Sequence, residues 1–179
     1  MISTLLVAHP WFGPTVLAVL VVTGPLLGWW LLGRPPRVSW ALFGVSLVPV
    51  VLLTLVPVQR ELFERCAVGW ALPTFGRVEL LANVLLFVPP VLLAAVATRR
   101  PLLALLGGVL ASACIEAVQA LLPVLGRSCD TNDWLSNAIG AALGAVLAAV
   151  ALVLARRHSP RTDDAQEPVD AVRAEDAVR

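Results

Sequence analysis

The sequence predicts an all-α membrane protein, a bundle of five transmembrane helices. Of its 179 residues, 59% are hydrophobic, and the mean hydropathy is +0.86. Only 14% are charged, against roughly 25% in soluble domains. The apolar residues gather in stretches of about 20, the length that a helix needs to cross a bilayer. If the first stretch lies at the interface instead, four helices cross and the fold class is unchanged.

Segments that contain arginine or proline separate the predicted spans, which are residues 14–33, 38–58, 78–98, 102–122 and 133–155. Residues 1–13 then form a short extracytoplasmic N-terminus. Residues 156–179 are polar, charged and contain two prolines, so we expect a disordered cytoplasmic tail. Because residues 1–10 carry no arginine or lysine, we expect the first span to be a retained anchor rather than a cleaved signal.

Arginine placement predicts the orientation, because cytoplasmic loops of membrane proteins are enriched in positive charge. With five spans, one side of the membrane receives Arg34, Arg37, Arg99, Arg100, Arg156, Arg157 and Arg161. We predict that this side is cytoplasmic, with the N-terminus outside and the C-terminus inside.

The cysteines fit this topology. Cys66 and Cys129 fall in two different outer segments, where an oxidising environment lets disulfides persist. We predict a bond between them, with two free thiols as the alternative. Cys114 lies within a span and is expected to be a small buried residue.

Polar side chains form a layer near the outer ends of three spans. Asn83, Glu116 and Asn137 each lie roughly 6 to 9 Å from the outer end of their helix. Helical spacing gives three polar faces, made of Glu79 with Asn83, of Ser112 with Glu116 and Gln119, and of Asp133 with Asn137 and the glycine step Gly140-x-x-x-Gly144. Because ionisable groups are costly within a membrane, we expect these faces to meet in one outward-opening pocket.

Four residues carry the candidate chemistry, each with a structural alternative. Arg127 can bind an anionic group through its planar fork, or it can anchor the chain at the interface or pair with Asp130 or Glu116. Asp130 and Asp133 can bind hydroxyls or a cation, or they can cap the last helix. Glu116 can act as an acid or base, or it can hydrogen-bond to amides on neighbouring helices.

The sequence shows no pattern typical of a metal, cofactor or nucleic-acid site. Zinc-type Cys/His spacing, a nucleophile with a neighbouring histidine and a glycine-rich phosphate loop are all missing from the sequence. The net charge is +1, and no basic stripe indicates nucleic acid. We therefore expect no cofactor, and we expect membrane lipids as partners.

Three segments between Glu79 and Gly144 carry a resemblance to a known family. They are Asn83-Val-Leu-Leu-Phe-Val-Pro89, Ser112-Ala-Cys-Ile-Glu116-Ala-Val-Gln119, and the run from Arg127 through Asp130, Asp133 and Asn137 to Gly144. In these segments the chain resembles the VanZ-like family of small bacterial membrane proteins. The resemblance implies a multi-pass protein of the bacterial plasma membrane and cell envelope. The family is named after a teicoplanin-resistance protein, which raises the question of glycopeptide tolerance without implying that this copy confers it.

The function we favour from the sequence is binding rather than catalysis. An outward-facing pocket would take a lipid-linked or amphiphilic ligand, with these residues around its polar part: Asn83, Glu116, Gln119, Arg127, Asp130, Asp133 and Asn137. The alternative is a membrane enzyme acting on a lipid substrate with Glu116 as acid/base. A transporter is disfavoured because the inner halves of the spans are apolar and no inverted repeat is evident.

Overall fold

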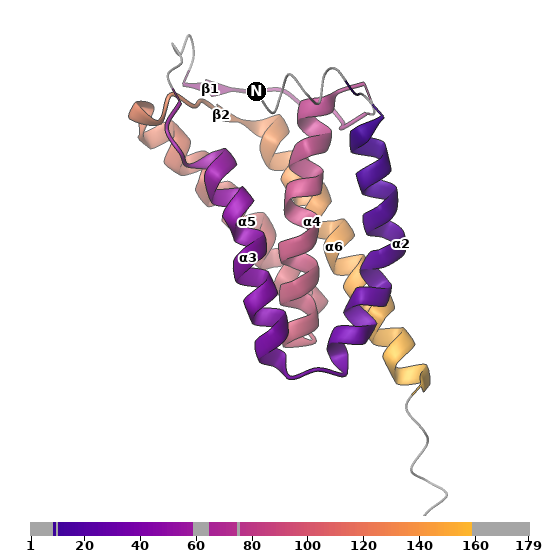
Figure 1. Ribbon diagram of the computed structural model, residues 1–179. Helices are drawn as coiled ribbons and strands as arrows, with labels where there is room; N and C mark the ends of the chain where they lie inside the picture. The colour runs from indigo at the N-terminus through magenta and orange to yellow at the C-terminus, as the bar shows by residue number, and fades with distance from the viewer. Residues whose placement is uncertain (1–8, 10, 59–64, 75, 159–179) are drawn as a thin grey trace, which may run out of the picture.

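The computed structural model describes residues 9, 11–58, 65–74 and 76–158, which form a bundle of long helices (Figure 1). The long helices are α2 (Phe12–Leu32), α3 (Pro36–Thr54), α4 (Val78–Thr98), α5 (Pro101–Leu121) and α6 (Thr131–His158). All 5 are long and apolar enough to cross a membrane. The predicted all-α bundle of five spans is confirmed, and its first helix has 21 residues, as many as α4 and α5.

Local sequence signals set the helix ends. α3 and α5 begin at Pro36 and Pro101, since the fixed φ of proline suits the first helical position. α4 has the predicted bounds. α3 ends at Thr54 instead of residue 58, because Pro57 disfavours helical conformation in the residue before it. α6 continues past the predicted end at residue 155 to His158.

α4 is the centre of the bundle and contacts all four other long helices. In Figure 1, α3 and α5 lie on one side of α4, and α2 and α6 lie on the other. The glycine step lets α6 approach α4 closely: a Cβ on Gly144 would lie 2.6 Å from the carbonyl oxygen of Val88, and one on Gly140 would overlap that of Val84. These glycines therefore pack helices within one bundle.

The disulfide end of the bundle is the end that carries the two short strands, at the top of Figure 1. There β1 (Cys66–Ala67) pairs in parallel with β2 (Cys129–Asp130), with Cys66 opposite Cys129. The predicted disulfide joins these two cysteines, whose Cα atoms are 4.5 Å apart. It ties the segment after α3 to the start of α6 across 63 residues of sequence.

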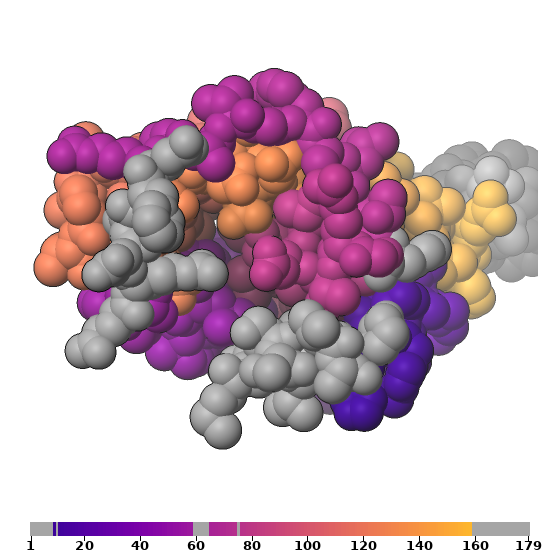
Figure 2. All heavy atoms as spheres, turned by 90° about the horizontal axis from the view of Figure 1, so that it is seen from above, coloured from indigo at the N-terminus to yellow at the C-terminus, as the bar shows by residue number. Residues whose placement is uncertain are grey.

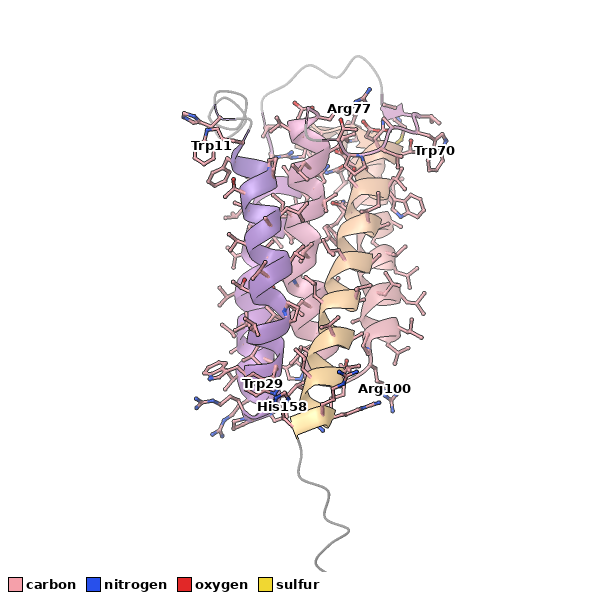
Figure 3. The ribbon with its side chains drawn as sticks, turned by 90° about the vertical axis from the view of Figure 1, so that its right-hand side faces the viewer. Trp11, Trp29, Trp70, Arg77, Arg100 and His158 are labelled. Carbon is pink, nitrogen blue, oxygen red and sulfur yellow. A yellow bond between two sulfur atoms is a disulfide. The ribbon has the colours of Figure 1, made fainter. Side chains whose placement is uncertain are left out.

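The arginine end is the opposite end, where the turns before α3 and α5 and the last turn of α6 lie together (Figure 1). Figure 3 places Trp29, Arg100 and His158 there, and places Trp11, Trp70 and Arg77 at the disulfide end. Tryptophan near both ends is typical of the two membrane interfaces. Which end faces the cytoplasm stays a prediction from the arginines. Most of the predicted N-terminal segment and of the predicted tail, residues 1–8, 10 and 159–179, lies outside the described residues.

One burial prediction is wrong. Cys114 is exposed on α5 instead of buried. α5 is apolar on almost all sides, so its sequence pattern does not distinguish the face that meets other helices from the face that meets lipid.

Candidate functional site

Residues of the predicted polar layer form several separate hydrogen bonds at the disulfide end, and those around Glu116 and the start of α6 are called the polar network. Glu116 on α5 reaches the start of α6, where its Oε2 accepts a hydrogen bond of 2.8 Å from the backbone N–H of Asp130. Asp130 directly precedes α6, and its Oδ1 accepts hydrogen bonds from the backbone N–H of Asn132 at 2.8 Å and from its Nδ2 at 3.0 Å. Asp130 therefore caps α6, which is the structural alternative to ligand binding.

Asp133 lies in the first turn of α6 and accepts a hydrogen bond from the side chain of Asn83 on α4. Its carboxylate is close enough to those of Asp130 and Glu79 for their charges to interact, and Glu116 interacts in the same way with Asp130 and Asp133. Carboxyl groups from α4, α5 and α6 thus lie near one another at the disulfide end. No group of three or more His, Cys, Asp or Glu in the described part of the chain has the arrangement to hold a metal ion.

The buried amide of Asn137 joins α6 to α5. Its Nδ2 donates a hydrogen bond of 2.9 Å to Oγ of Ser112. Asn137 Oδ1 and the neighbouring Ser136 Oγ are buried with no hydrogen-bond partner. The indole N–H of Trp134 is also buried without a partner. An unsatisfied buried polar atom costs about 1–3 kcal/mol, so this part of α6 holds both acceptor and donor capacity that the protein itself does not satisfy.

Two of the predicted site residues turn toward the end of α3. Gln119 is buried and donates from Nε2 to the backbone carbonyl of Thr54 at 2.9 Å, where it satisfies a carbonyl at the C-terminus of α3. Arg127 follows the short 3₁₀ helix η1 (Pro123–Leu125), and its Nε donates to the carbonyl of Val56 at 3.3 Å. Gln119 thus ties α5 to the end of α3, and Arg127 ties the loop after α5 to the segment after α3.

The structure adds two residues that the sequence analysis did not single out. Thr131 Oγ1 accepts a hydrogen bond of 2.9 Å from the backbone N–H of Gly69 and donates one of 2.6 Å to its carbonyl. Asn132 Oδ1 accepts a hydrogen bond of 2.7 Å from the backbone N–H of Ala71. Figure 2 shows the result, with the magenta spheres of residues 65–74 around the orange start of α6. The run of capping residue types after Cys129 was the available signal.

An apolar groove of about 520 Å³ lies between α3, α4 and α5. Phe87, Cys114 and Ile115 line it toward the disulfide end, and Trp40 and Leu103 line it toward the arginine end. Because Cys114 and Trp40 are exposed, the groove opens on the surface of the bundle that faces lipid. Ile115 directly precedes Glu116 in α5, so consecutive residues of one helix belong to the groove and to the polar network.

A family model described as VanZ/LLP1 matches residues 15–153. This range runs from the first turn of α2 almost to the end of α6 and includes the whole polar network. The chain belongs to the VanZ-like family. No curated protein and no solved structure matches it. In this VanZ-like protein the family match therefore covers α2 and α3 as well as the three segments that carried the resemblance.

The predicted site residues divide into three groups in this VanZ-like protein. Glu116, Asp130, Asp133 and Asn83 come together around the start of α6. Asn137 lies one helical turn deeper and contacts Ser112 instead. Gln119 and Arg127 contact the backbone after α3.

Proposed function

We propose that this VanZ-like protein binds a lipid-linked or amphiphilic molecule of the bacterial cell envelope. The observation that carries the proposal is the apolar groove between α3, α4 and α5, whose lining toward the disulfide end includes Ile115, the residue before Glu116 of the polar network. An amphiphile needs this combination, a place for its chain and a polar place for its head at the end of it. The head would sit at the predicted outer side of the membrane.

The acceptors of the network select the chemistry of the head. Carboxylates of Glu116, Asp130 and Asp133 act on one another here, and Asn137 Oδ1 adds an unpaired buried acceptor. Carboxyl and amide oxygens are acceptors, so they favour a head that donates hydrogen bonds, such as an amine or a group of hydroxyls. They favour a phosphate head less, because its oxygens are acceptors too.

The groove supplies access and a modest part of the affinity. A chain dissolved in the bilayer gains no hydrophobic free energy on entering an apolar groove, since lipid is as apolar as the groove wall, so packing against the wall supplies what is gained. The groove also lets the chain reach the protein sideways without crossing water. Its volume of about 520 Å³ falls in the usual range of roughly 300–1,000 Å³ for ligand pockets. Selectivity between amphiphiles then comes from the head.

An acyl-bearing glycopeptide has the required parts, an apolar chain and a head rich in hydroxyl and amino groups. We propose it as one ligand of this class, which would connect binding to glycopeptide tolerance. The apolar chain is essential in this proposal, so a glycopeptide core without its acyl chain should bind poorly.

Filling the groove tests the proposal. A Cβ on Gly107, which lines the groove, meets nothing within 4 Å, so Gly107→Phe can start its side chain at the groove wall without a clash. Gly44 on α3 is equally open but lies outside the groove, so Gly44→Phe is the matched control. Teicoplanin and its deacylated core are the probes, with binding measured in nanodiscs. Gly107→Phe should weaken teicoplanin binding about tenfold, a change of 1.4 kcal/mol, and Gly44→Phe should not. Equal binding of the acylated and deacylated probes by the wild type would reject the proposal.

The alternative, a membrane enzyme with Glu116 as acid/base, is separated by Glu116→Gln. The glutamine keeps an acceptor for the Asp130 N–H and removes the charge. An enzyme would still bind its substrate after this change but stop converting it. A binding protein would return the probe unaltered with either residue, as checked by mass spectrometry of the released probe.

A further inference from the structure

A second cavity, of about 640 Å³, lies at the arginine end. It is bounded by the last turns of α2 and α6 and by the turns before α3 and α5. Its basic side chains are those of Arg34, Arg99, Arg156 and His158, and among the described residues no carboxylate lines it. The full charges of the arginines exceed the partial negative charge, roughly half a unit each, at the C-termini of α2, α4 and α6 nearby. The cavity therefore favours an anion.

Aromatic rings restrain two of the basic side chains that line this cavity. The guanidinium carbon of Arg34 lies 4.5 Å from the centre of the Trp30 ring, a cation–π contact that limits its movement. His158 donates from Nδ1 to the carbonyl of Leu154 at 2.9 Å, and its ring lies 5.6 Å from that of Trp29. Figure 3 shows Trp29 and His158 together at this end of the bundle. The cavity thus combines positive charge with an apolar aromatic side.

Arg99 adopts a backbone conformation that strains any residue other than glycine. Its φ is 55°, and it is the only residue other than glycine with positive φ in the described part of the chain. Helices commonly place glycine just after their last turn because the left-handed conformation strains other residues. An arginine here brings its guanidinium to the cavity in spite of that strain.

We propose that this cavity binds the phosphodiester headgroup of an anionic phospholipid in the leaflet at the arginine end. Guanidinium groups form paired hydrogen bonds with phosphate oxygens. Basic pockets between transmembrane helices at the cytoplasmic side suit such headgroups, and the arginine end is the predicted cytoplasmic side. Trp29, Trp30 and Leu152 would contact the glycerol and upper acyl region. This site lies at the opposite end from the proposed amphiphile site and selects a head of different chemistry.

The sequence provides a matched control for each arginine. Arg34, Arg99 and Arg156 line the cavity, whereas their near neighbours Arg37, Arg100 and Arg157 do not. The pocket variant therefore replaces the first three by glutamine, and the control variant replaces the second three. Both variants lose the same positive charge from the same end. The electrostatic attraction of the surface to anionic lipid and the arginine signal for membrane orientation therefore decrease equally in both.

The experiment uses the full-length protein with phosphatidylglycerol and phosphatidylcholine of identical acyl chains. Native mass spectrometry measures which lipid stays bound, with monodisperse behaviour and helical circular dichroism as the check on folding. The wild type should prefer phosphatidylglycerol, the pocket variant should lose at least tenfold of that preference, and the control variant less than threefold. Equal losses in the two variants would show surface attraction alone and overturn the proposal. If a triple variant does not insert, the single pair Arg34→Gln and Arg37→Gln makes the same comparison.

Two other sources of negative charge are distinguished in the same assay. In phosphatidylcholine alone, inorganic phosphate at millimolar concentration should bind weakly. Binding that is as tight as that of the lipid would identify a free-anion site and reject the lipid. The chain after His158 carries Asp163, Asp164, Glu167, Asp170, Glu175 and Asp176. A lipid preference that appears only when these acids are replaced by amides would assign the cavity to the tail and overturn the proposal.

Discussion

The two ends of this VanZ-like protein use polar side chains in opposite ways. At the disulfide end, carboxylates, amides and hydroxyls bind the protein's own backbone, as Glu116 does at Asp130 and Gln119 does at Thr54. At the arginine end, charged side chains of one sign surround a cavity of about 640 Å³. The first arrangement stabilises the fold, and the second leaves charge for something outside it.

The difference follows from what each end must hold together. The segments at the disulfide end are long and irregular, so their backbone groups need partners from side chains. The turns at the arginine end are short, and Pro36 and Pro101 begin the next helices directly. Short turns need few side-chain partners, and the arginines there are therefore available for binding.

Among the predicted changes, removal of the disulfide should lower the free energy of unfolding most. The loss should be confined to the disulfide end. The bond closes a loop with a sequence separation of 63 residues, and such bonds contribute about 2–4 kcal/mol. The value should lie near 2 kcal/mol, because α4 and α5 within that loop stay in the membrane and already restrict the unfolded chain. The double variant Cys66→Ser with Cys129→Ser should melt lower in detergent than the wild type.

Hydrogen exchange locates that loss. Residues 65–74 should exchange faster in the double variant, whereas residues 99–104 at the arginine end should not change. Reduced wild type is the matched control and should behave like the double variant, since both retain Cys114. Faster exchange at both ends would mean that the ends are not independent, and the comparison would fail.

Substitution of Glu116 should have the next largest effect on the free energy of unfolding. Glu116→Leu leaves the Asp130 N–H without its acceptor, which should cost about 1–2 kcal/mol of unfolding free energy. Glu116→Gln keeps an acceptor and relieves the repulsion from Asp130 and Asp133, so its stability should equal or exceed that of the wild type. Thermal melts of the two variants separate the hydrogen bond from the charge. A Leu variant as stable as the Gln variant would show that the network does not support the fold.

The sequence predicts the helices well because the membrane sets their length. Residues 78–98 match α4 at both ends, since arginines at 77 and 99 mark the limits of the apolar run. The pairing of Cys66 with Cys129 also follows from topology. The burial of Cys114 does not, because an almost uniformly apolar helix carries no signal for which face meets lipid. Only packing against α4 and α6 decides it.

The candidate site is harder to predict because its partners are backbone atoms. The sequence marks Gln119 and Arg127 as polar residues at a given depth, but their acceptors are the carbonyls of Thr54 and Val56, which any residue could supply. The arginine cavity was missed for a similar reason. Arg34 and Arg37 give the same orientation signal, and only the turn between α2 and α3 determines that Arg34 lines the cavity and Arg37 does not.

Substitution of Arg99 should change stability by the smallest amount. It is the sharpest test of the contrast between the two ends, because stability and lipid binding should change in opposite directions. Arg99→Gly relieves a φ of 55°, which should raise the free energy of unfolding by about 0.5–1 kcal/mol. The same change removes a guanidinium from the cavity, so the preference for phosphatidylglycerol should fall several-fold.

Arg100→Gly is the control for this pair of opposite changes. Arg100 has a φ of −130°, which needs no glycine, and it does not line the cavity. Glycine there should lower stability slightly by adding freedom to the unfolded chain, and it should leave lipid preference almost unchanged. If Arg99→Gly gained stability and kept its lipid preference, the strain would have no connection to binding, and the contrast drawn between the two ends would fail at Arg99.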